Sequence, residues 1–216
     1  MSGPIWITPS QQTNEWIKER VGCLTASRMA DALSFLRSGK ESEARRKLKI
    51  ALVAERMTGF ATENYVTDAM KWGIEQEAAA AERYEEVTGT LVQKCGFALH
   101  ESIPYLGASP DRLVGETGLA EIKCPTTTTF VEWRAAGVIP EQHKPQMLLQ
   151  LAVCQRAFVD FFAFDPRIMA REYQHFLLRF EPPQEEIKKV EEAAKVFLAE
   201  VEELFEQITM ATGDAA

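Results

Sequence analysis

The chain has 216 residues, of which 46% are hydrophobic and 26% charged, a composition that suits a globular protein with a sizeable core. It has no apolar run of the roughly 18–20 residues that a membrane-spanning helix needs, and its N-terminus has neither the basic nor the apolar region of a secretory signal. The net charge of −8 argues against a protein that binds nucleic acid through overall positive charge.

The charge is unevenly distributed along the sequence. From Glu181 onward there are ten acidic residues against three lysines, whereas the segment 37–56 holds seven basic residues against three glutamates. A local basic surface on an acidic protein is therefore possible, although most such segments are solvated helix surfaces.

The four cysteines lie far apart and form no Cys-x-x-Cys pair: Cys23, Cys95, Cys124 and Cys154. This spacing argues against a zinc site, an iron–sulfur cluster and a disulfide framework, and it suits a reducing cytoplasm. We expect free thiols that are buried as small apolar groups.

Helical patterns dominate the first 90 residues. Apolar residues at helical spacing predict helices over residues 44–57 and 67–87. The segment 25–27 (Thr-Ala-Ser) offers N-cap side chains for a further helix, and we expect the basic segment 37–42 to be a loop.

Strand patterns begin at Leu91. The expected strands are residues 91–100, a segment around Leu113, and residues 119–123, 157–164 and 173–180. The expected helices between them are residues 130–136 and 145–154, the second with Pro145 in its first turn. No internal repeat or linker divides the sequence, so we expect a single domain over residues 1–216.

A long acidic helix is predicted at the C-terminus, over about residues 183–209. Its apolar residues recur at alternating spacings of three and four, and they form one stripe: Ile187, Val190, Ala194, Phe197, Val201, Leu204 and Ile208. The stripe could pack on the protein's own core or on a neighbouring subunit, and the sequence leaves both open.

Three charged residues gather at one end of a predicted β-hairpin, GASPDRLVGETGLAEIKCP (residues 107–125). Because strand side chains alternate, Glu121 and Lys123 share one face while Ile122 points into the core. The turn can bring Asp111 beside Glu121, and two carboxylates that close repel each other unless a cation intervenes. Mg²⁺ suits such a site because it prefers oxygen ligands, and the backbone carbonyl of Ile122 could supply a further oxygen. Lys123 would then orient or help deprotonate an attacking water, or stabilise the negative charge that develops on a phosphorane.

A purely structural explanation competes with this one. Glu121 and Lys123 could form a solvated charge pattern, with Asp111 as a turn residue. The flanking dipeptides Ser109-Pro110 and Cys124-Pro125 favour a built site, because each proline restricts the backbone beside the charges.

An Asp-x9-Glu-x-Lys hairpin is the signature of the PD-(D/E)xK nuclease superfamily, and the fuller string resembles the phage lambda exonuclease family of viral recombination nucleases. WIKERVGCLTASR (residues 16–28) resembles the family's Arg-x-Gly-x-x-Thr-Ala-Ser segment, with Val21 before the glycine, and WGIEQE (residues 72–77) resembles its Trp-Gly-x-x-x-Glu helix. The helix with Gln146 and the segment FDPR (residues 164–167) match in order and spacing. The resemblance implies an α/β (α+β) fold: a restriction-endonuclease-like core with a central mixed β-sheet flanked by helices, N-terminal helices and a long C-terminal helix.

The resemblance also implies roles for individual residues. Asp111 and Glu121 would bind the metal, Lys123 would be the catalytic lysine, and Glu77 would bind a second metal ion or hold a water, although a solvated glutamate is its simpler explanation. Four further residues match the family's 5′-phosphate pocket: Arg20, Ser27, Ser109 and Gln146. Without the family, Ser27 could be only a helix N-cap, and Gln146 with Gln150 could only mark the polar side of a helix. Met70 falls where the family places a residue that wedges between the DNA strands; a core methionine is the alternative.

By the same resemblance the enzyme would be a homotrimeric ring that encloses duplex DNA, so basic residues are needed only along the channel. The candidates for the channel are Arg28, Arg37, Lys40, Arg45 and Arg46. The expected cofactor is Mg²⁺, for which Mn²⁺ could substitute, with one or two ions in each active site. The expected partner is a single-strand-annealing recombinase, encoded nearby in a phage or prophage and acting in the cytoplasm of the bacterial host.

The sequence thus predicts a Mg²⁺-dependent 5′→3′ exonuclease that degrades one strand of duplex DNA from a 5′-phosphorylated end, releases 5′-mononucleotides and leaves a 3′ overhang. Two alternatives remain: a structure-specific or restriction-type endonuclease of the same fold, and a DNA-binding relative without catalysis. The intact set of Asp111, Glu121 and Lys123 disfavours the second alternative.

Overall fold

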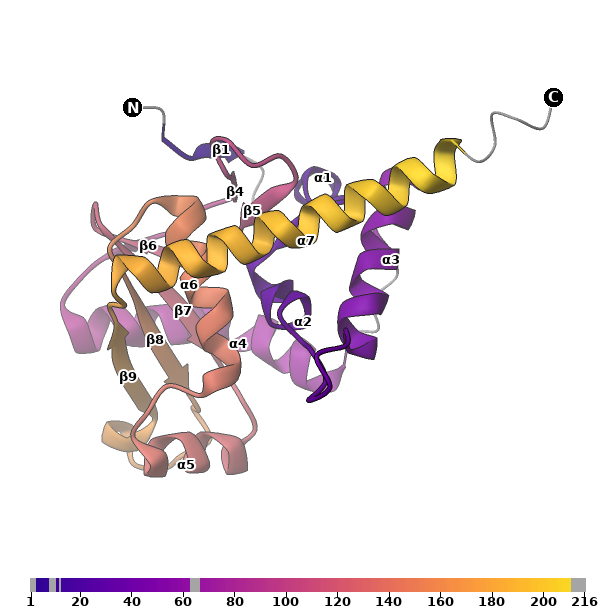
Figure 1. Cartoon of the computed structure of the whole chain (residues 1–216). Helices are drawn as coiled ribbons and strands as arrows, with labels where there is room; N and C mark the ends of the chain where they lie inside the picture. Colours follow the sequence, from indigo (N-terminus) through magenta and orange to yellow (C-terminus); the bar gives the residue numbers. More distant parts are fainter. Residues whose placement is uncertain (1–2, 8–10, 12, 63–66, 211–216) are drawn as a thin grey trace.

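The computed structural model describes residues 3–7, 11, 13–62 and 67–210, which form two mixed β-sheets flanked by helices (Figure 1). The first half contains β1 (Ile5–Ile7), α1 (Asn14–Glu19), β2 (Leu24–Thr25), the 3-10 helix η1 (Ala26–Arg28), α2 (Met29–Ala32), α3 (Glu43–Thr58) and α4 (Asp68–Thr88). Then follow β3 (Val92–Gln93), β4 (Phe97–Leu99), β5 (Leu106–Ala108), β6 (Arg112–Val114), β7 (Gly118–Lys123), α5 (Thr127–Ala136), η2 (Glu141–His143), α6 (Lys144–Cys154), β8 (Phe158–Phe164), η3 (Arg171–Tyr173), β9 (His175–Phe180) and α7 (Gln184–Met210).

The larger sheet has the strand order β3-β6-β7-β8-β9, with β7 and β8 parallel and the other neighbours antiparallel. The smaller sheet has the order β1-β4-β5-β2, in which only the β2–β5 pair is parallel among the described strands. The mixed sheet and the β6–β7 hairpin were predicted. The prediction of one strand over residues 91–100 was wrong, because the chain leaves the larger sheet after β3 and enters the smaller sheet as β4.

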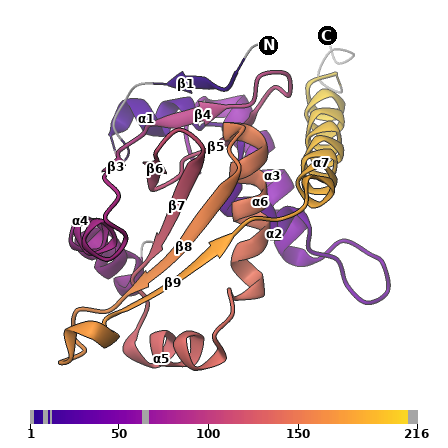
Figure 2. The ribbon, with the colours of Figure 1, turned by 90° about the vertical axis from the view of Figure 1, so that its left-hand side faces the viewer.

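Helices cover both faces of the larger sheet (Figure 2). On one face, Ala80 and Tyr84 of α4 pack with Ile122 of β7, so Ile122 points into the core as expected. On the other face, α6 and α7 pack with Leu119 and Phe161 in the main core. Because side chains alternate along β7, its charged residues lie on the face that α6 covers.

The helix boundaries follow local capping chemistry. The Thr67 hydroxyl accepts a hydrogen bond from the Met70 N–H at 3.2 Å and starts α4. The helix predicted over residues 130–136 begins earlier, at Thr127, because Thr126 caps it. The N-cap expected in segment 25–27 is absent, since this segment enters η1 and no side chain there caps a backbone N–H. No described helix is both long and apolar enough to span a membrane.

The C-terminal helix α7 lies across α6 and reaches α3 (Figure 1). Its apolar stripe is buried in the protein's own core as far as Val201. This part of the stripe therefore packs on the protein's own core, whereas Ile208 is 38% exposed. The four cysteines form no disulfide; three are buried and Cys95 is partly buried.

Candidate active site

The β6–β7 hairpin brings the predicted acidic residues together. In its register, Arg112 pairs with Ala120 and Leu113 with Leu119, so Asp111 lies next to the end of β7 that carries the charges. Asp111 Oδ2 accepts a hydrogen bond of 2.6 Å from the Ile122 backbone N–H. The Asp111 carboxylate is thereby fixed beside Glu121 and is not a free turn residue.

Glu121 is 1% exposed, and each of its oxygens has an amide donor from α6. Oε1 accepts from Gln146 Nε2 at 2.7 Å and pairs with the Lys123 ammonium, whereas Oε2 accepts from Gln150 Nε2 at 2.6 Å. The two glutamines are four residues apart, so they project from the same side of the helix. The expectation of a solvated charge pattern therefore fails at Glu121.

The electrostatics of the site are those of two carboxylates and one cation. Burial and the negative charge of Glu121 raise the pKa of Asp111 well above its usual value, although Lys123 opposes the effect. Burial alone would lower the pKa of Lys123, but Glu121 and Asp111 outweigh it and raise that pKa above the usual value. Lys123 is thus an ammonium that can donate hydrogen bonds at neutral pH.

This donor set fits a hard divalent cation, because a cation beside Asp111 and Glu121 would relieve the repulsion that raises the pKa of Asp111. Among the described residues, no three His, Cys, Asp or Glu side chains form a metal-binding group. The described side chains therefore supply two carboxylate ligands at this site, those of Asp111 and Glu121. Further oxygen ligands would come from the backbone, water or a phosphate.

Glu77 lies next to this pair but is bound to an arginine. Its Oε1 is 2.6 Å from Arg112 Nη1, which also donates to the backbone carbonyl of Asp111 at 2.6 Å. Glu77 is therefore linked to the metal-binding candidates through Arg112, and it does not join them in one cluster.

The residues predicted for catalysis and those predicted for phosphate binding line one cavity of about 180 Å³. Its lining consists of Gln11, Trp16, Arg20, Thr25, Ala26, Ser27, Ser109, Asp111, Glu121, Lys123, Gln146 and Gln150. The structure thus brings together Arg20 and Ser27 from the N-terminal segment with Ser109, which follows β5, and Gln146 of α6.

Arg20 is the cation of this cavity that lacks a carboxylate partner within the described part of the chain. Its guanidinium lies 3.9 Å from the centre of the Trp16 ring, and the Trp16 indole N–H donates to Ser109 Oγ at 3.2 Å. Burial and the nearby charge of Arg28 lower the pKa of Arg20 to about 10. The hydroxyls of Ser27 and Thr25 are hydrogen-bonded to each other, and Ser27 caps no helix. A partly buried guanidinium beside hydroxyls and an amide is suited to a phosphate.

The five basic candidates for the channel differ in environment. Arg45 is buried, pairs with Glu200 at 2.6 Å and lies between the rings of Phe35 and Phe197. Its assignment to a DNA channel was therefore wrong, since its guanidinium is enclosed within the protein.

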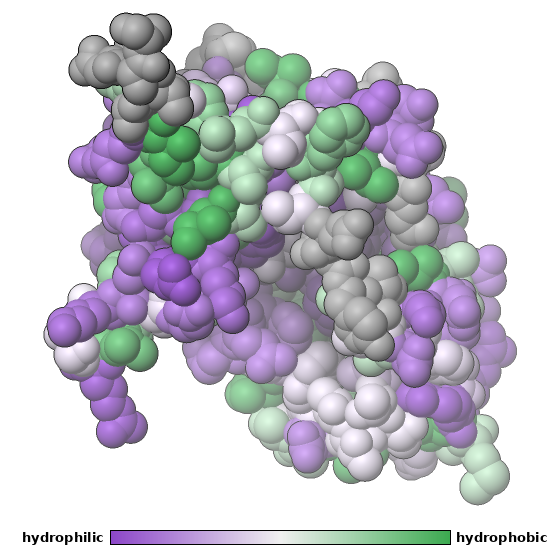
Figure 3. Space-filling model, turned by 90° about the vertical axis from the view of Figure 1, so that its right-hand side faces the viewer, coloured by the Kyte–Doolittle hydropathy of each residue, from purple (hydrophilic) through white to green (hydrophobic). Residues whose placement is uncertain are grey.

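The other basic candidates lie nearer the surface. Arg28 pairs with Glu55, and Arg46 pairs with Glu43 on the surface of α3. Arg37 and Lys40 are exposed on the loop between α2 and α3, which projects from the body in Figure 2 and is mostly hydrophilic in Figure 3.

Met70 is 56% exposed near the start of α4, which excludes its alternative role as a core methionine. Sequence reasoning missed Trp16 and Gln150 as members of the cavity. For Gln150 a signal existed, since Gln146 and Gln150 stand four residues apart in a helix that is otherwise apolar from Met147 on.

Known proteins resemble the chain in sequence and structure. The profile of the YqaJ-like viral recombinase domain matches residues 15–157. The crystal structure of an alkaline exonuclease, LHK-Exo, from Laribacter hongkongensis is similar with a TM-score of 0.87 and 36% identity, over 94% of this chain and 100% of that chain. LHK-Exo in complex with dAMP matches with 35% identity and the same TM-score and coverage.

A phage-related exonuclease from Haemophilus somnus 129PT is 11% identical, with a TM-score of 0.65 over 86% of this chain and 96% of that chain, and it supports the fold alone. No curated protein sequence is significantly similar to the chain. The profile match covers more than half of the chain and agrees with the predicted resemblance to lambda-exonuclease-like proteins. The chain is therefore a nuclease that belongs to the YqaJ-like viral recombinase domain family and has the mixed α/β fold of alkaline exonuclease.

Proposed function

We propose that the protein is a Mg²⁺-dependent 5′→3′ exonuclease that acts on duplex DNA with a 5′-phosphorylated end. The observation that carries the proposal is the shared cavity, in which the guanidinium of Arg20 faces the same space as Asp111, Glu121 and Lys123. An enzyme with both groups in one cavity can hold a terminal phosphate while it cleaves the neighbouring phosphodiester.

Asp111 and Glu121 would hold the divalent ion, together with the Ile122 backbone carbonyl. Nucleases of this family use divalent metal ions, and Mg²⁺ matches these oxygen donors, with Mn²⁺ as the expected substitute. When bound, such an ion supplies a Lewis acid that polarises the phosphodiester and neutralises its charge. Glu77 could contribute to a second ion only after its bond to Arg112 opens.

The protein's own groups would act around the scissile phosphate. The Lys123 ammonium would orient the attacking water by hydrogen bonding and stabilise the negative charge that develops on the phosphoryl oxygens. Gln146 and Gln150 would keep both oxygens of Glu121 in place. Because the pKa of Lys123 is raised, we assign it a donor's role rather than that of a general base.

The terminal 5′-phosphate would bind at Arg20, Ser27, Ser109 and Gln146. Gln146 can serve both groups, because its amide has two N–H donors and uses one for Glu121. Water oxygen attacks phosphorus, and the bond from phosphorus to O3′ of the terminal nucleotide breaks. A 5′-mononucleotide leaves, and the shortened strand again carries a 5′-phosphate. LHK-Exo forms a complex with dAMP, a nucleotide of the class released here.

The proposed assembly is a trimer, and the proposed partner is a recombinase. A homotrimeric ring around the duplex would present Arg37, Lys40 and Arg46 to the DNA, with Met70 as the strand-separating residue. The 3′ overhang would pass to a single-strand-annealing recombinase of the same phage or prophage.

A time course on linear duplex DNA, labelled at either the 5′ or the 3′ end, tests the proposal. We expect the 5′ label to appear first, as mononucleotide, in Mg²⁺ and not in EDTA, and covalently closed circles to survive. Nicked circles would instead indicate the endonuclease alternative. Earlier loss of the 3′ label would refute the polarity, and activity in EDTA would refute the metal requirement.

A further inference from the structure

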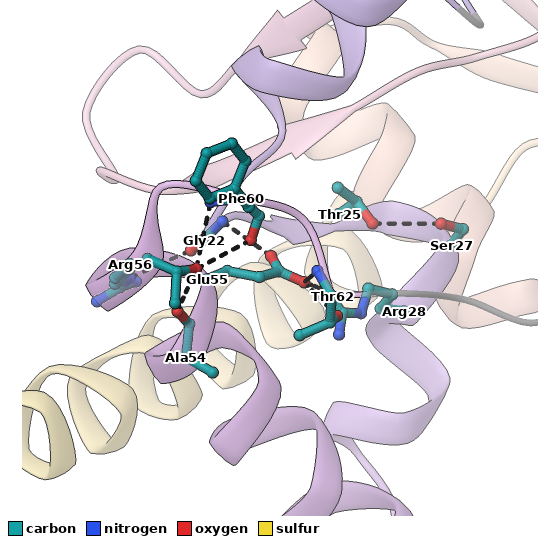
Figure 4. Close-up of polar contacts among 10 residues, drawn as sticks. Gly22, Thr25, Ser27, Arg28, Ala54, Glu55, Arg56, Phe60 and Thr62 are labelled. Atoms are coloured by element: carbon teal, nitrogen blue, oxygen red, sulfur yellow. Dashed lines mark hydrogen bonds and ion pairs between the residues drawn. The ribbon is translucent and has the colours of Figure 1, made fainter.

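Two side chains from the last turns of α3 bind the backbone of one residue, Gly22, in the N-terminal segment. The Gly22 N–H donates to Glu55 Oε2 at 2.9 Å, and Arg56 Nε donates to the Gly22 carbonyl at 3.2 Å (Figure 4). Two adjacent side chains thus satisfy both backbone groups of the same residue. We call Glu55 and Arg56 the Gly22 clamp.

Glycine is required at the clamped position. Gly22 has φ +71°, a conformation that side-chain-bearing residues rarely adopt, and a Cβ there would lie 2.6 Å from Arg56 Cγ. The close approach of Arg56 therefore depends on the missing side chain. This explains physically why the motif around Arg20 contains a glycine.

The Glu55 carboxylate also accepts hydrogen bonds from two further segments of the chain, as Figure 4 shows. It is 3% exposed, and its Oε1 accepts from the Thr62 hydroxyl at 2.7 Å and from Arg28 Nη1 at 3.3 Å. A buried carboxylate with these partners joins α3 to the chain on either side of Ser27 and to the segment before α4. Loss of its charge would leave Arg28 without its ion-pair partner.

Arg56 connects Gly22 to the C-terminal helix. Its Nη1 is 2.7 Å from Glu202 of α7, and its guanidinium lies 3.9 Å from the centre of the Tyr105 ring. The contacts with Glu202 and Tyr105 therefore fix the position of the guanidinium that donates to the Gly22 carbonyl.

Glu55 lines a cavity that adjoins the proposed phosphate pocket. Gly22 is two residues from Arg20 and five from Ser27, which line the catalytic cavity. A neighbouring cavity of about 300 Å³ is lined by Glu55, Arg28 and Thr62, and it shares Trp16, Arg20 and Thr25 with the catalytic cavity. Since Glu55 pairs with Arg28, Arg20 is the cation without an ion pair among the described residues that line this neighbouring cavity.

We propose that Glu55 and Arg56 are positioning residues that hold segment 20–27 in the conformation that recognises the 5′-phosphate of DNA. Neither residue lines the catalytic cavity, so both act through Gly22 and Arg28. The inference rests on the proposed function, because it assigns the specificity of the same pocket.

The test uses Glu55→Gln and Arg56→Lys, with Glu132→Gln at an exposed position of α5 as the control. Each full-length variant is assayed for kcat and KM on linear duplex with 5′-phosphate or 5′-hydroxyl ends. For both clamp variants we expect kcat/KM on phosphorylated ends to fall roughly tenfold, mainly through KM, while the value on hydroxyl ends changes by less than about twofold. Arg56→Lys keeps the charge but lacks the Nε donor, so it tests the clamp even where Glu55→Gln fails to fold.

A second measurement does not depend on activity. In hydrogen–deuterium exchange of the DNA-free protein, segment 20–28 should exchange faster in both clamp variants than in the wild type and in Glu132→Gln. Unchanged exchange in this segment, or equal losses of kcat/KM on both kinds of end, would overturn the clamp proposal. A wild-type enzyme that does not distinguish the two ends would instead overturn the 5′-phosphate proposal, while faster exchange would still support the clamp.

Discussion

Gln150 donates a hydrogen bond from its side-chain amide to Glu121 Oε2 at 2.6 Å, on the opposite oxygen from Gln146. Gln150 is completely buried, and its own Oε1 has no hydrogen-bond partner among the described residues. The orientation of the amide follows from chemistry, because only its NH₂ group can donate to a carboxylate. Gln150 thus fixes the direction in which Glu121 presents its oxygens.

Replacing Gln150 by leucine would leave Glu121 Oε2 without its buried donor. We expect the free energy of unfolding to fall by about 1–3 kcal/mol in urea titrations. We also expect calorimetric titration to show an affinity for Mn²⁺ about tenfold weaker. Gln142→Leu, at an exposed residue just before α6, is the control. An unaltered Mn²⁺ affinity in Gln150→Leu would show that Glu121 is positioned without it.

Lys123→Ala should separate binding from hydrolysis. Loss of the ammonium removes a donor at the reacting phosphate, so we expect kcat to fall by about 10²–10³-fold. Fluorescence anisotropy in Ca²⁺ should show that binding of 5′-phosphorylated duplex weakens by less than about threefold, since Arg20 remains. Lys144→Ala, which removes an exposed partner of Glu141, should leave both unchanged. Full activity of Lys123→Ala would refute its proposed role.

Asp111→Asn should stabilise the protein in the absence of metal. Burial and the charge of Glu121 raise the pKa of Asp111 in the folded state. The folded protein therefore binds the carboxyl proton of Asp111 more tightly than the unfolded chain does. The stability that this proton contributes is complete below the ordinary aspartate pKa and is lost as pH rises through the raised pKa. At pH 8 in EDTA we expect Asp111→Asn to melt about 2–5 °C above the wild type, without activity.

The control for this prediction is Asp31→Asn, at an exposed position. Mg²⁺ should reduce the difference, because it favours the ionised carboxylate of the wild type. Differential scanning fluorimetry between pH 5 and 9 measures both effects, and a lower melting temperature of Asp111→Asn throughout would contradict the raised pKa.

Arg45 and Arg46 are neighbours in sequence with opposite environments. Arg45→Ala removes a buried guanidinium bonded to Glu200 and to the Ala32 carbonyl, so we expect a loss of about 1–3 kcal/mol in the free energy of unfolding. Arg46→Ala removes a surface pair with Glu43, worth about 0–1 kcal/mol. Chemical denaturation compares the two variants, and equal stabilities would refute the structural role of Arg45.

Much of the site could be predicted because its chemistry is local. Alternation along β7 places Glu121 and Lys123 on one face, and a tight hairpin leaves Asp111 few positions other than beside them. The environment of Arg45 could not be predicted, since the rings that enclose it come from Phe35 and from Phe197, which is distant in sequence. A count of basic residues contains no information on which of them are buried.

The break between β3 and β4 has a similar origin. Residues 91–100 have strand propensity throughout, but the two halves pair with different sheets, and pairing is decided by distant strands. The Gly22 clamp was hidden for the same reason, because α3 and the segment around Gly22 meet only in the folded chain.

The contact between α3 and α7 brings the basic segment 37–56 next to the acidic C-terminal helix. Glu200 binds both Arg45 and Lys49, and Glu202 binds Arg56, so the acidic C-terminal helix neutralises part of the basic segment from within the molecule. Of the seven basic residues in segment 37–56, only Arg37 and Lys40 have no ion pair among the described residues. Few counterions would therefore be released when DNA binds this segment, and its affinity should depend only weakly on salt. In the proposed ring, enclosure of the duplex rather than the charge of this segment would keep the enzyme on its substrate.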